Sequence, residues 1–250
     1  MIKLPGTLLS GGEWAQRCTR FFAGIACLGL ITVNCSPSVE SDTFSCARVP
    51  SAAGAAPANP ESGNVHLIDE IAPLTSDGQV NVVIEIPSGT NAKWEVSKAD
   101  GALRVDTEAG QPLVIDYLAY PANYGMVPQS HLPEASGGDG DPLDVIVLGP
   151  ALPRGCVLAV DIIGVLHLVD RGERDDKLIA VYPDSPIGDV ATLDELNSQY
   201  NGLTEILEIW FTNYKGKEQA YTNGFGSRDD AQAILSDAIN AYEKAAKGVR

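Results

Sequence analysis

Short apolar segments separated by Gly, Pro and Asp recur along the chain between residues 80 and 183. Many are rich in β-branched residues, and the first, "VNVVIEIP" (80–87), ends at a proline. Stretches of this length and composition, bounded by turn residues, are typical of β-strands. The others are "AKWEVSK" (92–98), "PLVIDYLAY" (112–120), "DVIVLG" (144–149), "VLAVDIIGVLHLVD" (157–170) and "KLIAVYP" (177–183). Short strands with frequent turns predict a closed or nearly closed β-barrel.

The pattern changes to a helical one after residue 190. Thr192 and Glu195 have the spacing of a capping box at a helix start. Apolar residues then follow helical spacing at 203, 206, 207, 210, 211 and 214, which predicts one buried stripe. A second helix is expected to open at Ser227 and to run through "DDAQAILSDAINAYEKAAK" (229–247). Strands first and helices last indicate an α+β domain.

The N-terminal quarter of the chain has a different composition. Arg17 and Arg20 precede "FFAGIACLGLITV" (21–33), an apolar run of signal-peptide length that is short for a membrane span. Residues 1–35 are therefore interpreted as a secretory signal, with lipid attachment at Cys35, a misplaced start or a buried apolar helix as alternatives. Residues 36–63, rich in Ser, Ala, Pro and Gly, predict a flexible tether before a folded domain at 64–250. This reading predicts an exported, periplasmic protein, with cytoplasmic residence as the alternative and membrane contact only through an N-terminal anchor.

Composition and charge narrow the class of partner. The 250 residues are 44% hydrophobic, which is enough for a sizeable core, and carry a formal net charge of -16. So acidic a chain is not expected to bind nucleic acid, but it can bind an anionic substrate if divalent cations stand between them. Outside the leader only Cys46 and Cys156 remain, enough for one disulfide bridge and no thiolate zinc site.

Two acidic stretches suggest chemistry. "GGDGDPLDVIVLGP" (137–150) places Asp139, Asp141 and Asp144 directly before an apolar strand. Such crowded carboxylates indicate either a solvated turn or a site for a hard cation such as Mg²⁺; an EF-hand loop is excluded because Asp144 stands where its glycine belongs. "VDRGERDDKL" (169–178) reads alone as a charged hairpin loop, but if the two loops flank adjacent strands they can share several cations.

The combination of motifs resembles the soluble family I inorganic pyrophosphatases. "GDGDPLDVIVL" is similar to the family signature D-x-D-P-x-D. Five further stretches resemble family motifs and stand in family order, three before the signature and two after it: "VVIEIP", "AKWEV", "YPANYG", "DRGERDDKLIAV" and "FTNYKGK". The resemblance implies a five-stranded OB-like barrel with helices packed outside it, and a homo-oligomer. It also implies hydrolysis of pyrophosphate to two orthophosphates by direct attack of a metal-bound water, with several Mg²⁺ ions, or Mn²⁺ in their place.

The resemblance further implies a role for each matching side chain. Asp141 would be the general base. The implied metal ligands are Asp139, Asp144, Asp175, Asp170 and Glu85, with Asp144 shared between two ions. The implied phosphate-binding residues are Lys93, Tyr124, Lys177, Tyr214 and Lys215.

One departure from the family pattern stands at Thr107, where the family has a phosphate-binding arginine. Arg104 is close in sequence, but strand alternation can direct it elsewhere. Several additional residues also precede the "YPANYG" stretch. Two alternatives therefore stay open: hydrolysis of another phosphoanhydride, and an exported barrel that binds metal or phosphate without turnover.

Overall fold

The computed structural model describes residues 65–216 and 219–248. The leader (1–35) and the tether (36–63), and with them Cys35 and Cys46, lie outside these residues. Within the described part, no helix is long and apolar enough to cross a membrane. Cys156 is buried and disulfide-bonded.

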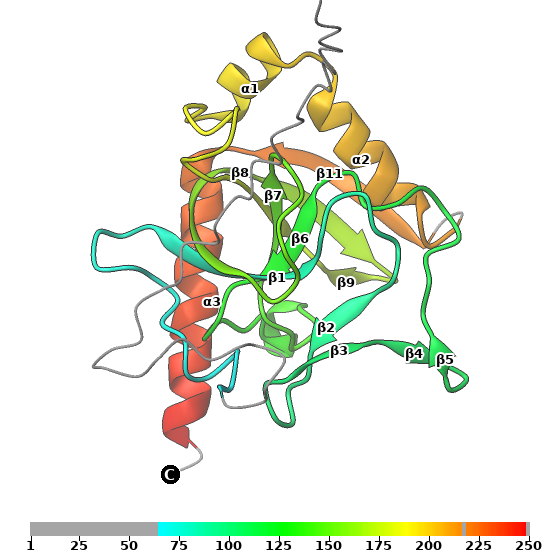
Figure 1. Cartoon of the computed structure of the whole chain (residues 1–250). Helices are drawn as coiled ribbons and strands as arrows, with labels where there is room; N and C mark the ends of the chain where they lie inside the picture. The colour runs from blue at the N-terminus through cyan, green and yellow to red at the C-terminus, as the bar shows by residue number, and fades with distance from the viewer. Residues whose placement is uncertain (1–64, 217–218, 249–250) are drawn as a thin grey trace, which may run out of the picture. The chain divides into compact units, whose positions relative to one another are not determined.

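Five strands form a closed ring (Figure 1). They are β1 (Val80–Ile86), β6 (Asn123–Met126), β7 (Asp144–Leu148), β10 (Lys177–Val181) and β8 (Val157–Asp170). β1 pairs antiparallel with both β6 and β8, so the first and last members of the ring meet. β7 and β10 are the parallel pair of the ring. The predicted barrel, five-stranded and OB-like, is thereby confirmed.

Other strands lie outside this ring. β11 (Ala220–Gly226) and β9 (Glu173–Arg174) extend the sheet from β8. β2 (Trp94–Val96) and β3 (Leu103–Val105) form one hairpin, and β4 (Thr107–Glu108) and β5 (Gln111–Pro112) form another.

Helices follow the strands, as expected: α1 (Leu193–Gln199), α2 (Leu203–Asn213) and α3 (Arg228–Gly248). The Thr192 hydroxyl accepts a hydrogen bond from the Glu195 backbone N–H at 3.2 Å, which confirms the N-cap of α1. The Ser227 hydroxyl does the same for the Asp230 N–H at 3.2 Å. In α2 the predicted stripe is buried at Leu207, Trp210 and Phe211, whereas Ile206 is 57% exposed, contrary to expectation.

Alternate residues of the central strands enter two different apolar clusters. On β7, Val145 and Val147 join a cluster that includes residues of α3, while Ile146 and Leu148 join one that includes residues of α1 and α2. Successive side chains of a strand point to opposite faces, so helices on both sides of the sheet require apolar residues at every position. This explains why "DVIVL" and "KLIAV" are apolar at every position after the first.

One strand prediction was wrong, and two strands were not predicted. The segment 112–120 contributes only Pro112 to β5 and Val114 to an isolated bridge with Ala92, because its side chains alternate irregularly between solvent and the α2 cluster. The neighbouring "NYGM" segment, which was not predicted as a strand, is the ring strand β6. β11 was not predicted at all, since its sequence "AYTNGFG" is polar and glycine-rich.

Candidate active site

The two acidic loops converge because they lead into β7 and β10. These strands are parallel, with Lys177 in register with Asp144. Parallel strands begin at the same edge of a sheet, so the loops that precede them open at the same end of the barrel. The Lys177 ammonium donates to Asp144 Oδ2 and to Asp175 Oδ1, at 2.5 Å each. The buried cation of Lys177 thus joins Asp175 to Asp144, which lies 33 positions before Lys177 in the chain.

The first acidic loop is held by backbone hydrogen bonds. The Asp141 N–H donates to Asp139 Oδ1 at 2.9 Å, while Leu132 exchanges hydrogen bonds of 2.9 Å with Gly140 and Asp141. Gly140 has a φ of 77°, a left-handed conformation that glycine adopts without strain. The Asp139 and Asp141 side chains are therefore carried by an ordered turn.

Asp170 lies at the end of β8, which runs antiparallel to β10 and so ends at the edge where β10 begins. Lys215, just beyond α2, donates to Asp170 Oδ2 at 2.6 Å. The other carboxylate oxygen, Asp170 Oδ1, is buried and has no hydrogen-bond partner among the described residues. A buried oxygen of this kind is a natural place for a cation or an ordered water.

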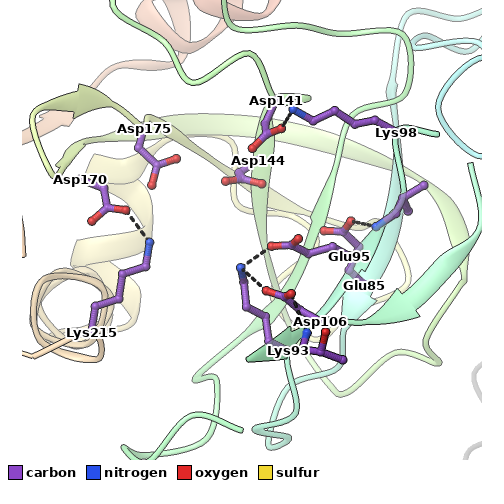
Figure 2. Close-up of polar contacts among 12 residues, drawn as sticks. Glu85, Lys93, Glu95, Lys98, Asp106, Asp141, Asp144, Asp170, Asp175 and Lys215 are labelled. Atoms are coloured by element: carbon purple, nitrogen blue, oxygen red, sulfur yellow. Dashed lines mark hydrogen bonds and ion pairs between the residues drawn. The ribbon is translucent and has the colours of Figure 1, made fainter. Parts of the chain in front are cut away.

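The β2–β3 hairpin supplies another wall of the site (Figure 2). Glu85, which is 6% exposed, accepts a hydrogen bond from the Val96 N–H at 2.8 Å. The Lys93 ammonium pairs with Glu95 and with Asp106, the latter at 3.2 Å. Glu95 and Asp106 were not predicted as site residues. The only signal for Glu95 in the sequence was its period-two spacing from Lys93, which places both side chains on one face of the strand.

Aromatic side chains line the side of the site formed by α2. The rings of Tyr120, Tyr124 and Tyr214 pack among Trp210 and Phe211, and the centroids of Tyr214 and Trp210 lie 4.4 Å apart. The Lys177 ammonium is 5.7 Å from the Tyr124 ring centroid, and Lys215 is 5.4 Å from that of Tyr214. Tyr120, to which sequence analysis gave no role, contacts both other tyrosines.

The site has more buried negative charge than its lysines neutralise. Burial, with the charge of Asp144 adding to it, raises the pKa of Glu85 well above its usual range. Burial also raises the pKa of Asp175 to about 6, although Lys177 acts in the opposite direction. Burial likewise raises the pKa of Asp139. Burial alone would lower the pKa of Lys177, but Asp144 and Asp175 raise it. These carboxylates would be stabilised by further cations.

The predicted site residues therefore fall into three linked groups. Lys177 joins Asp144 to Asp175, next to the turn that carries Asp139 and Asp141. The second group is Asp170 with Lys215, and the third is Glu85 and Lys93 at the hairpin. Across residues 65–216 and 219–248, no three acidic, His or Cys side chains stand close enough to hold a metal ion as they are, because lysines occupy the spaces between carboxylates.

Arg104 and Lys98 each make an ion pair that the sequence did not predict. Arg104 makes a two-point ion pair with Asp100, at 2.6 and 2.5 Å, and is exposed, so it does not replace the missing arginine. Thr107 is exposed in β4. Lys98, which is not among the site residues that the resemblance implies, pairs with Asp141 (Figure 2).

Comparisons with known proteins agree with this geometry. The family model described as inorganic pyrophosphatase matches residues 82–243. Soluble inorganic pyrophosphatase 2 of Chlamydomonas reinhardtii is 36% identical over 179 residues, covering 66% of this chain and 81% of the relative. The inorganic pyrophosphatase of Xanthomonas axonopodis pv. citri is 34% identical over 169 residues, covering 66% and 89%.

Solved structures show the same fold. The inorganic pyrophosphatase of Helicobacter pylori aligns with a TM-score of 0.60 at 32% identity, covering 70% of this chain and 99% of that one. The enzyme from Schistosoma japonicum aligns with a TM-score of 0.66 at 26% identity, covering 71% of each chain. The match runs from β1 into α3, and on this ground the chain belongs to the soluble family I inorganic pyrophosphatases and is an inorganic diphosphatase.

Proposed function

We propose that this chain hydrolyses pyrophosphate by direct attack of water in a site that holds several divalent cations. The observation that carries the proposal is the surplus of buried carboxylate at one barrel end. Asp170 Oδ1 is buried without a partner, and the pKa values of Asp175 and Glu85 are raised by burial. Oxygen donors of this kind suit Mg²⁺, or Mn²⁺ in its place.

The three groups support the ligand set that the family resemblance implies. Asp139, Asp144 and Asp175 would hold a first ion, with Asp144 shared, while Asp170 and Glu85 would hold ions that arrive with the substrate. When bound, these ions supply positive charge that offsets the phosphate oxygens and acidifies water. Lys177 and Lys215, which now pair with these metal-binding carboxylates, would then be free to contact the substrate.

Each remaining side chain has a task in that reaction. Asp141, about half exposed, accepts a proton as the oxygen of water forms a bond to one phosphorus. The bridging P–O bond breaks, and the second orthophosphate leaves. Lys93, Tyr124, Lys177, Tyr214 and Lys215 are the donors proposed to hold phosphate oxygens. Lysines and tyrosine hydroxyls stabilise charge on the leaving phosphate, as positioning and electrostatics do in phosphoryl transfer generally.

The test is phosphate release from pyrophosphate by the purified full-length protein, with Mg²⁺ and with EDTA. Asp141→Asn keeps the shape of the side chain and removes its basicity, and it should lower kcat by about 100-fold or more. Asp237→Asn, an exposed change on α3, is the matched control and should leave kcat unchanged. A folded wild-type protein that binds Mg²⁺ but releases no phosphate would contradict the proposal.

A second candidate substrate is another phosphoanhydride, such as a short polyphosphate or a nucleotide. It is favoured by the exposed Thr107 in place of the family arginine and by the β4–β5 hairpin beside it. Measuring kcat/KM for pyrophosphate, tripolyphosphate and ATP under the same conditions separates the two. If kcat/KM is higher for tripolyphosphate or for ATP than for pyrophosphate, that compound is the principal substrate. A binding role without turnover requires that none of them be hydrolysed.

We further propose that the protein is exported and assembles as a homo-oligomer. The leader pattern supports export, and so does the disulfide at Cys156, because disulfides persist in oxidising compartments. An exported diphosphatase would recover phosphate. Cell fractionation with intact-mass measurement tests export, and full-length protein retained in the cytosol would contradict it. Light scattering of the purified protein gives the number of subunits.

A further inference from the structure

The side chain of Lys98 reaches from the β2–β3 turn to the loop that carries the proposed base. Its ammonium forms an ion pair with the Asp141 carboxylate and donates to the Gly140 carbonyl at 3.2 Å (Figure 2). Both the base and the peptide group before it are thus held by one cation. Among the described residues, no other side chain makes a hydrogen bond or ion pair with the Asp141 carboxylate.

The turn that carries Lys98 is itself anchored. The Gly101 N–H donates to the Ser97 carbonyl at 2.7 Å, and the Leu67 N–H donates to the Gly101 carbonyl at 3.1 Å. Gly101 has a φ of 65°, and a Cβ there would meet His66 at 2.4 Å, so the chain must pass close to this segment. The ammonium of Lys98 therefore starts from a fixed backbone position.

A base works only when its carboxylate oxygen lies within hydrogen-bond reach of the proton that it accepts. Asp141 is 49% exposed, so without a partner its side chain would be free to change rotamer. We propose that Lys98 is a positioning residue for the reaction: it orients the Asp141 carboxylate and steadies the Gly140–Asp141 peptide. This inference rests on the proposed role of Asp141 as the base.

The size of the effect follows from exposure. Lys98 is 59% exposed, and pairs between exposed charges contribute about 0.2–1 kcal/mol. If that energy selects the reactive rotamer, its loss lowers kcat by about 1.4- to fivefold. Lys98→Met removes the charge and keeps an apolar stem. Lys98→Arg restores a cation in nearly the same place and should recover most of the loss.

Steady-state kinetics at saturating Mg²⁺ test the inference. Lys98→Met should lower kcat with little change in KM for pyrophosphate, and it should have no further effect in an Asp141→Asn background. Lys247→Met is the matched control, because Lys247 also pairs with a carboxylate, Glu243 at 3.0 Å, but on α3. It should leave kcat unchanged.

Backbone hydrogen exchange supplies a readout that does not depend on turnover. In EDTA, the amides of residues 138–141 should exchange faster in Lys98→Met than in the wild type and return to wild-type rates in Lys98→Arg. Unchanged kcat in Lys98→Met, an equal loss in the Asp141→Asn background, or an effect confined to KM would each overturn the inference. An inactive wild type would instead refute the proposed function, and the exchange rates would still report whether Lys98 holds the loop.

Discussion

Lys177→Met should strongly destabilise the metal-free protein, because it removes the cation between two carboxylates. The Lys177 side chain is 3% exposed, and its partners Asp175 and Asp144 are 11% and 23% exposed. At 2.5 Å and an effective dielectric constant of ~20, each pair attracts by about 7 kcal/mol before desolvation is counted. Desolvation offsets much of this, and removing one partner of a buried pair costs about 3–5 kcal/mol.

The assay is urea unfolding in EDTA at about pH 7.5, with Lys247→Met as the control for loss of an exposed ion pair. Mg²⁺ should stabilise Lys177→Met more than it stabilises the wild type, because the ion binds carboxylates that no longer have a lysine partner. A loss below about 1 kcal/mol in EDTA, or equal Mg²⁺ stabilisation of both proteins, would refute the reasoning.

The same pair predicts a pH dependence in EDTA. The folded pKa of Asp175 is about 6, above its ordinary value of 3.8, so ionised Asp175 opposes folding. Its stabilising contribution is fully present below pH 3.8 and is lost as the pH rises through about 6. Lys177 reduces this loss by lowering the pKa of Asp175. The loss of unfolding free energy in Lys177→Met should therefore be larger at about pH 7.5 than at about pH 5. The opposite trend would contradict the pairing of Lys177 with Asp175.

Two other changes test the barrel and the substrate contacts. Gly125→Ala on β6 would place a Cβ 1.9 Å from the Val83 carbonyl oxygen of β1, and it should lower the free energy of unfolding by about 3 kcal/mol. Urea unfolding measures the loss; Gly248→Ala, where a Cβ meets nothing, is the control, and a Gly125→Ala value within about 0.5 kcal/mol of wild type would disagree with the packing. Lys215→Met should lower kcat/KM for pyrophosphate by about 100-fold, because a cation aimed at the phosphate oxygens is lost. Phosphate-release kinetics measure this, and an unchanged kcat/KM would mean that Lys215 serves only Asp170.

Local patterns in the sequence predicted much of the fold. The segments that form β7, β8 and β10 are rich in apolar, mostly β-branched residues, and the helix stripe and the Thr192 cap follow from spacing alone. The prediction was wrong where the pattern was irregular or polar, in segment 112–120, in β6 and in β11. In β6 and β11, pairing with distant strands outweighs local preference. Segment 112–120 has the local preference of a strand, but beyond Pro112 of β5 it pairs only through one isolated bridge.

The composition of the site was also visible in the sequence, since both acidic loops and their lysines lie next to recognisable strands. What only the tertiary structure decided is which of these side chains meet. The parallel register of β7 and β10 places Lys177 between Asp144 and Asp175, and the β2–β3 turn brings Lys98 to Asp141 across 43 positions of the chain. A residue's local pattern records whether it is buried and in which kind of element, but register and strand order arise from long-range pairing. For that reason the local pattern around Lys98 could not predict its partner, Asp141.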